Sequence, residues 1–179
     1  MTEVGSVYGE ALYSLARDEG FGKVILDQLS TLEQCFSQEP DFLRLLSTPN
    51  LTKVERCQIL DDSFRGKVEP YVLNFLKILT EKGYARHFSD CVASYRELFN
   101  RDNGILPVTA VTAVALTDSQ KAKLTLKLTQ ITGKQIDLTN KLDPNCLGGV
   151  RLDYDGKRVD DTVSHRLDAV RNHLKNTVL

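Results

Sequence analysis

Glycines in the second half of the chain are the first residues whose spacing suggests chemistry. A phosphate-binding loop needs Gly-Lys-Ser/Thr after an earlier glycine, so that backbone N–H groups surround the phosphates. The chain has four Gly-Lys pairs, but neither Ser nor Thr follows any of them. Gly148-Gly149 also lacks the third glycine and the following helix of a dinucleotide-binding turn. We therefore expect this pair to allow a close backbone approach where a strand begins.

Aspartates gather just after that glycine pair and suggest a calcium loop. They are Asp153, Asp155, Asp160 and Asp161. The EF-hand pattern places Gly at position six and Glu at position twelve. Here Gly156 falls at position four, and no Glu occurs anywhere in residues 105–179. We interpret Asp155-Gly156 as a hairpin turn and the later aspartates as helix-capping residues.

Histidines, cysteines and serines form no catalytic pattern. No cysteine pair has the C-x-x-C spacing of a zinc or redox site, and no Gly-x-Ser-x-Gly nucleophile turn occurs. The scattered residues are His87, His165, His173, Cys35, Cys57, Cys91 and Cys146. We expect no catalytic residue, no metal ligand and no cofactor. A small enzyme that uses these aspartates for catalysis is disfavoured, because no acid–base pair is present.

Charge and hydropathy divide the chain in two and exclude some classes of protein. Residues 1–104 carry 12 Lys+Arg and 16 Asp+Glu, whereas residues 105–179 carry 11 and 8. The overall net charge of -1 argues against a dedicated nucleic-acid binder, which needs a concentrated basic surface. No run of about 18 apolar residues predicts a membrane span, and the N-terminus has no signal-peptide pattern.

Helical periodicity dominates the first 104 residues. Val4, Val7, Tyr8, Ala11, Leu12, Leu15 and Ala16 recur on one face of the first helix. Five more helices follow, with either Asn50 or Thr52 capping the fourth and Pro70 opening the fifth. The fifth helix is apolar nearly all the way round. Two interpretations of it stay open, a central core helix or one wall of a groove that accepts an amphipathic helix from a partner.

The periodicity changes after Gly104, which predicts a domain boundary there. Alternating apolar residues predict a strand over 106–116, and Thr117 to Gln120 forms a capping box that opens a helix. Two shorter strands and a hairpin follow, and the last helix carries Val163, Leu167, Val170 and Leu174 on one face. The predicted fold class is α+β overall: an N-terminal six-helix bundle over 1–104, then a small C-terminal α+β domain over 105–179.

Several motifs in order along the chain resemble one family. The first helix, Tyr8-Gly-Glu-Ala-Leu-Tyr-Ser-Leu-Ala16, is similar to the Tyr-Ala-x-Ala-Leu-x-x-x-Ala opening of the F-type ATP synthase delta subunit. This family includes the mitochondrial oligomycin-sensitivity-conferring protein. The blocks Asn74–Gly83 and Val111–Thr117 also match. Asp143-Pro-x-x-Leu-Gly-Gly-Val150, followed by Val159-Asp-x-Thr-Val163, is similar to the C-terminal signature of the family.

Three positions depart from the pattern of the family. Tyr84 stands where Arg usually follows the glycine, and the nearest arginine is Arg86. Ala115 stands where Pro is common, and Thr162 replaces the usual Ser but keeps a hydroxyl for helix capping.

The resemblance implies a non-catalytic stator subunit of a proton-translocating ATP synthase. The N-terminal domain would hold the N-terminal helix of an alpha subunit between its first and fifth helices, and the C-terminal domain would hold the b subunits of the peripheral stalk. Mapped by motif, the groove would use Tyr8, Ala11, Leu15, Asn74, Phe75 and Ile78. The interior would take Leu12, Leu76 and Leu79.

The same resemblance implies one copy per complex and membrane attachment only through that complex. The first helix of the family begins almost at Met1, which favours a bacterial protein without a transit peptide, on the cytoplasmic face of the cell membrane. The alternative is a helical adaptor or regulatory binding protein unrelated to ATP synthase.

Overall fold

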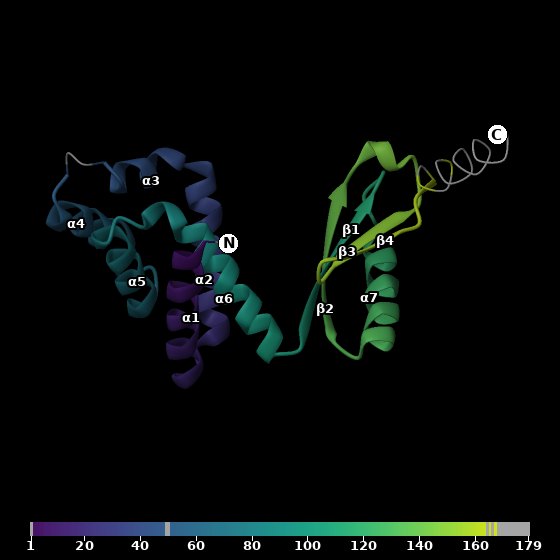
Figure 1. Ribbon diagram of the computed structural model, residues 1–179, viewed down its shortest axis with the longest axis horizontal. Helices are drawn as coiled ribbons and strands as arrows, with labels where there is room; N and C mark the ends of the chain where they lie inside the picture. The colour runs from purple at the N-terminus through teal and green to yellow at the C-terminus, as the bar shows by residue number, and fades with distance from the viewer. Residues whose placement is uncertain (1, 49–50, 164, 166, 168–179) are drawn as a thin grey trace. The chain divides into compact units, whose positions relative to one another are not determined.

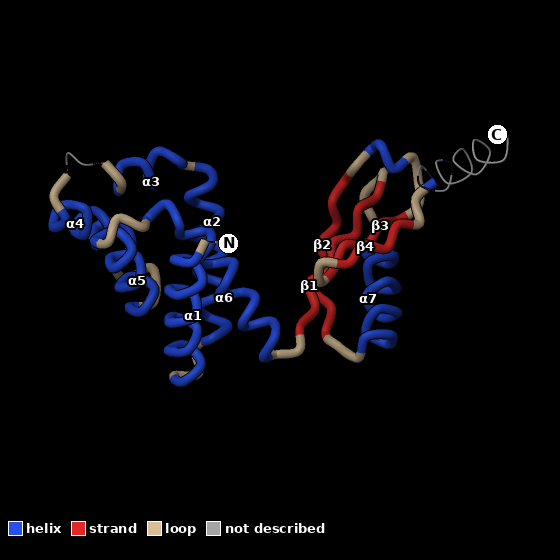
Figure 2. The backbone as a smooth tube through the Cα atoms, viewed as in Figure 1, coloured by secondary structure: helices blue, strands red, loops and turns tan. Residues whose placement is uncertain are grey.

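The computed structural model describes residues 2–48, 51–163, 165 and 167. The chain divides into two compact units, Met1–Phe99 and Asn100–Leu179, called here the helical unit and the sheet unit. Figure 2 shows helices throughout the first and strands confined to the second, so the overall α+β class is confirmed. The boundary at residue 104 stays a prediction; that residue lies between the helix that ends at Asp102 and the strand that begins at Ile105, a few residues after the division between the two units.

Six α-helices and a 3₁₀ helix occupy the described part of the N-terminal half. They are α1 (Glu3–Asp18), α2 (Gly22–Gln38), α3 (Pro40–Leu46), α4 (Lys53–Phe64), α5 (Pro70–Glu81), η1 (Ala85–His87) and α6 (Phe88–Asp102). Thr52 caps α4 through a reciprocal capping box with Glu55, while the other predicted cap, Asn50, lies outside the described residues. Pro70 occupies the first turn of α5 as predicted, where its missing N–H costs no hydrogen bond.

Aromatic rings from several helices meet in the core of the helical unit. The ring centroid of Phe36 on α2 lies 5.1 Å from that of Phe88 on α6 and 5.6 Å from that of Phe42 on α3. Phe64 of α4 completes this cluster, with its ring centroid 5.8 Å from that of Phe42. Because aromatic pairs at these separations add to the energy of apolar burial, this cluster holds four helices together.

Between Ile105 and Asp160, the sheet unit contains one α-helix, one 3₁₀ helix and four strands. They are β1 (Ile105–Thr112), α7 (Asp118–Thr132), β2 (Gln135–Leu142), η2 (Pro144–Cys146), β3 (Val150–Tyr154) and β4 (Lys157–Asp160). The strand order is β2-β1-β3-β4, with β1 parallel to β2 and the other pairs antiparallel. Figure 1 shows α7 lying along the sheet, and its Leu128 packs against Leu106, Val108 and Ile136.

The predicted first strand is shorter in the structure, and the predicted last helix lies partly outside the described residues. β1 ends at Thr112, not at residue 116, because the Thr112 hydroxyl donates to the Val114 carbonyl (2.8 Å) and turns the chain. Val114 is accordingly 76% exposed. Of the predicted last helix, Val163 and Leu167 are helical, whereas Val170 and Leu174 lie outside the described residues.

Candidate functional site

The N-terminal end of α1 is fixed on α6. Thr2 Oγ1 accepts a hydrogen bond from Gly5 N–H (3.3 Å) and donates one to Asp90 Oδ2 (2.7 Å). The hydrogen bond from Thr2 lowers the pKa of Asp90 and so favours its charged form. One threonine therefore caps α1 and ties its first turn to a carboxylate on the neighbouring helix.

Two glycines bring the backbones of α1 and α6 close together. A Cβ at Gly5 would lie 2.5 Å from Asp90 Cβ, and a Cβ at Gly9 would lie 2.6 Å from the Cys91 carbonyl oxygen. Non-bonded carbon atoms pack at about 3.5–4.0 Å, so neither position has room for a side chain. The contact fixes the rotation of α1 and turns inward Gly5, Gly9, Leu12, Tyr13 and Ala16.

This rotation leaves a second set of apolar residues of α1 at the surface. Val7 is 59% exposed and Leu15 is 43% exposed, Ala11 is exposed, and Val4 and Tyr8 are half-buried. We call Val4, Val7, Tyr8, Ala11 and Leu15 the α1 stripe. The sequence pattern placed them on one face with Leu12 and Ala16, but the structure divides that face into a buried side and an exposed side.

Tyr8 connects the α1 stripe with the end of α5. Its ring meets the ring of Tyr84 edge-on, with centroids 5.8 Å apart. The Tyr84 N–H in turn donates to the Leu79 carbonyl of α5 (2.7 Å). Tyr84, the position where the resemblance leads one to expect arginine, thus supplies an aromatic contact between the two helices named for the groove.

α5 combines a buried side with an exposed one. Asn74 is exposed and Ile78 is 45% exposed, as a partner-binding surface requires. Phe75 is only 6% exposed and its ring lies 6.5 Å from that of Phe88, so its predicted place at the surface is corrected to the core. Its position in the helix adjoins Leu76 and Leu79, which are buried as predicted.

Charged and thiol groups beside α5 already have partners inside the helical unit. Lys77 Nζ lies 2.7 Å from Asp61 Oδ1 on α4. Cys57 Sγ donates to Glu81 Oε1 (3.6 Å), and burial raises the pKa of this thiol, which keeps it protonated. The surface that Asn74 and Ile78 offer is therefore amide and apolar in character.

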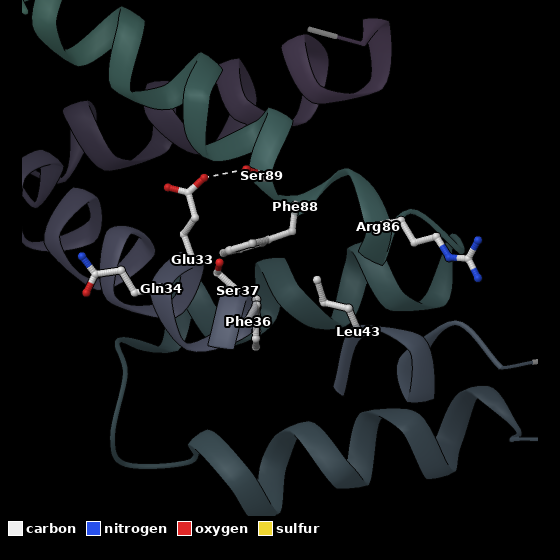
Figure 3. A pocket seen from close by; sticks show the side chains of 8 residues that line it. All are labelled: Glu33, Gln34, Phe36, Ser37, Leu43, Arg86, Phe88 and Ser89. Atoms are coloured by element: carbon white, nitrogen blue, oxygen red, sulfur yellow. Dashed lines mark hydrogen bonds between the residues drawn. The ribbon is translucent and has the colours of Figure 1, made fainter. Parts of the chain in front are cut away.

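A separate concavity of about 430 Å³ lies where α2, α3, η1 and α6 meet (Figure 3). Phe36, Leu43 and Phe88 give it an apolar lining. Glu33 is the carboxylate among its lining residues, and it accepts hydrogen bonds from Ser89 Oγ (2.6 Å) and from Arg96 Nη2 (3.1 Å). The Glu33 carboxylate is thus held in an ion pair and a hydrogen bond, and the concavity has no pair of groups arranged for acid–base catalysis.

The aspartates of the sheet unit have structural partners. Asp153 accepts a hydrogen bond from Arg158 Nε (2.9 Å), which lowers its pKa, and Asp160 accepts from the Thr162 hydroxyl (2.7 Å), with the same effect. Asp155 lies in the two-residue turn that joins β3 and β4, which confirms the hairpin. Within the part of the chain that the structure describes, no three His, Cys, Asp or Glu side chains gather as metal ligands.

Gly149 lies against the segment that follows β4. Its φ is +82°, and a Cβ there would lie 2.5 Å from the Asp161 carbonyl oxygen. Hydrogen bonds from Val163 N–H to the Gly148 carbonyl (3.0 Å) and from Asp161 N–H to the Val150 carbonyl (3.2 Å) hold the two segments together. The predicted close backbone approach at the glycine pair is confirmed.

Comparison with known proteins agrees with this arrangement. Residues 4–174 match the family described as ATP synthase delta (OSCP) subunit. The chain belongs to this family. It is 31% identical to the ATP synthase subunit delta of Alkaliphilus oremlandii over 176 residues, covering 98% of each chain. It is also 31% identical to that of Fusobacterium nucleatum, covering 93% of this chain and 95% of the relative.

A solved structure shows the same fold. The chain aligns with a chain of the Toxoplasma gondii mitochondrial ATP synthase hexamer with a TM-score of 0.77 and 17% identity, covering 97% of this chain and 98% of that one. Membership in the delta (OSCP) family makes the protein a structural subunit of ATP synthase that is not itself catalytic. It also excludes the alternative of an adaptor unrelated to ATP synthase. None of the described helices is both long enough and apolar enough to cross a membrane.

Gly5 and Gly9, the residues that expose the α1 stripe, were not among the predicted site residues. Gly5 and Gly9 are spaced as Gly-x-x-x-Gly, and that spacing was a readable signal of two helices in close contact. Val7 was assigned to the same apolar face as Leu12, although it is 59% exposed.

Proposed function

We propose that the protein is the stator subunit that links the alpha subunits of the catalytic head to the b subunits of the peripheral stalk. In this proposal the helical unit is a six-helix bundle that binds the N-terminal helix of an alpha subunit. The sheet unit binds the b subunits. The linkage resists the torque that the rotor exerts on the head during rotary ATP synthesis driven by proton translocation.

The proposal extends to where the subunit works. Its relatives named above include subunits from the bacteria Alkaliphilus oremlandii and Fusobacterium nucleatum, which supports a place on the cytoplasmic face of a bacterial cell membrane. The subunit is attached there peripherally, through the complex alone, in one copy.

The α1 stripe is the observation that carries the binding role. Its exposed members recur every four residues along α1, which is the pattern that an amphipathic helix of a partner can cover with its own apolar side. Asn74 and Ile78 extend this contact onto α5, with Tyr8 as the link. Phe75 supports α5 from the core side and makes no surface contact of its own.

Binding of a synthetic alpha-subunit N-terminal helix by the full-length protein tests this role. Leu15→Glu keeps a good helix former but places a charge in the stripe, so we expect affinity to fall about thirtyfold, the scale of an interface hot spot. Val54→Glu on α4 makes the same kind of change at another exposed apolar residue and should leave affinity unchanged. Equal losses in the two variants, or none in either, would place the alpha site elsewhere.

A further inference from the structure

α7 directs basic and apolar side chains away from the sheet. Leu124 and Leu128 are half-buried on its inner side, whereas Leu126 is 61% exposed and Ile131 is 80% exposed. Lys123 and Lys127 are exposed one turn apart on the same outer side, between these two apolar residues around the helix. We call Lys123, Leu126, Lys127 and Ile131 the α7 outer face.

The lysines of the α7 outer face have no acidic partner among the described residues. α7 contains a single acid, Asp118, and this residue pairs with Lys121 (3.8 Å). None of the ion pairs within the described ranges includes Lys123 or Lys127. The outer face therefore presents two uncompensated positive charges beside exposed apolar surface.

On the opposite face of the sheet, charged residues of β3 and β4 pair with each other. Leu152 and Tyr154 pack toward α7, so the alternating residues Arg151 and Asp153 of β3 point to the other side. Asp153 lies 2.9 Å from Arg158 and 3.4 Å from Arg151, so both arginines share one carboxylate. Lys141 of β2 is also exposed and outside these ion pairs, so the α7 outer face is distinguished by two such lysines one turn apart beside exposed Leu126 and Ile131.

We propose that the α7 outer face docks an acidic amphipathic helix presented by the b subunits. The inference rests on the proposed function and adds the docking face and its chemistry. Apolar residues of the partner helix cover Leu126 and Ile131, and its carboxylates pair with Lys123 and Lys127. Charge complementarity of this kind sets partner choice and register, while the apolar contact excludes water.

The test measures binding of the full-length chain to detergent-purified b subunits of the same ATP synthase. K123E/K127E should weaken binding about tenfold or more, because like charges then face each other across the contact. The milder pair K123Q/K127Q should weaken it less and should reduce its dependence on salt. K141E/K157E changes net charge equally on exposed residues of β2 and β4 and should bind like the unaltered chain. An unchanged urea midpoint of the sheet unit in every variant shows that the unit carrying the substitutions is folded.

The outcomes separate this inference from the proposed function. Loss with the α7 variants but not with K141E/K157E supports the α7 outer face. Equal loss in all variants, or full binding by K123E/K127E, overturns it and leaves the b-subunit role standing. Failure of the unaltered chain to bind b subunits overturns both. Self-association of the chain that K123E/K127E abolishes, with b binding intact, assigns the face to a second copy and overturns the inference.

Discussion

The helical unit and the sheet unit are stabilised in different ways. In the helical unit every helix contributes at least one buried apolar side chain, and aromatic rings from α2, α3, α4 and α6 contact one another. In the sheet unit α7 contributes no fully buried residue, and most of the buried side chains come from β1. The first unit depends on side-chain packing, and the second depends more on backbone pairing and on specific polar contacts.

This difference explains where exposed apolar surface occurs. The sheet unit is small, so its core cannot enclose every apolar side chain of α7 and of the loops. Val114, Leu126 and Ile131 remain outside and are available to a partner. In the helical unit the core is filled, and the α1 stripe is exposed because Gly5 and Gly9 set the rotation of α1.

Truncating one core residue in each unit is the strongest test of this contrast. Phe88→Ala removes a ring that contacts Phe36 and Phe75, and we expect the helical unit to lose about 3–5 kcal/mol. Ile136→Ala in β2 should cost the sheet unit about 2 kcal/mol, since that core is smaller. Hydrogen exchange of peptides from each unit, measured against urea, gives both values. Equal losses would remove the distinction between the two cores.

Backbone contact in the sheet unit is tested at Gly149. Gly149→Ala combines a positive φ with a Cβ 2.5 Å from a carbonyl oxygen, and we expect a loss of about 3 kcal/mol in sheet-unit stability. Gly156→Ala is the matched control, because Gly156 has a φ of +69° but open space around it. The control should cost about 1 kcal/mol. Similar urea midpoints for the two variants would show that the close approach adds nothing.

A polar contact at the end of β1 gives the next smaller effect. Asn140 Oδ1 accepts from Leu116 N–H (2.9 Å), and its amide donates to the Ala110 carbonyl and the Thr112 hydroxyl (2.9 Å each). Asn140→Ala leaves these groups unpaired, and we expect a loss of about 2 kcal/mol. Thr139→Ala, at an exposed site on the same strand, should cost much less. Thermal unfolding of both variants decides whether the polar group matters.

Acid sensitivity should give the smallest effect. Hydrogen bonds lower the pKa of Asp153 and of Asp160 in the folded chain. Their charged forms therefore stabilise the fold above about pH 4, the unfolded pKa, and this contribution is lost as pH falls through the folded pKa. Asp160→Asn should flatten the fall in sheet-unit stability between about pH 5 and pH 2. An unaltered acid profile in urea unfolding would show that Asp160 contributes nothing.

Local signals predicted the elements well, and contacts between distant residues were harder to predict. The Thr117 and Thr52 caps and the Asp155-Gly156 hairpin depend on neighbouring residues, and the structure has all three. Periodicity marks which residues are apolar, but it does not say which apolar residues another helix covers. Val7 was grouped with Leu12 for that reason, whereas Phe75 was assigned to the groove by motif, which likewise does not show what covers a side chain. The parallel pairing of β1 with β2 depends on how α7 packs back, which no strand pattern encodes.

The close contact at Gly5 and Gly9 has a mechanical consequence. A side chain between two helices can change rotamer under load, whereas a glycine contact has no side chain to yield and transmits displacement directly between backbones. α6 then continues unbroken to Asp102, and only Asn103 and Gly104 separate it from β1. A force applied to the α1 stripe therefore reaches the backbone of α6 directly through this contact.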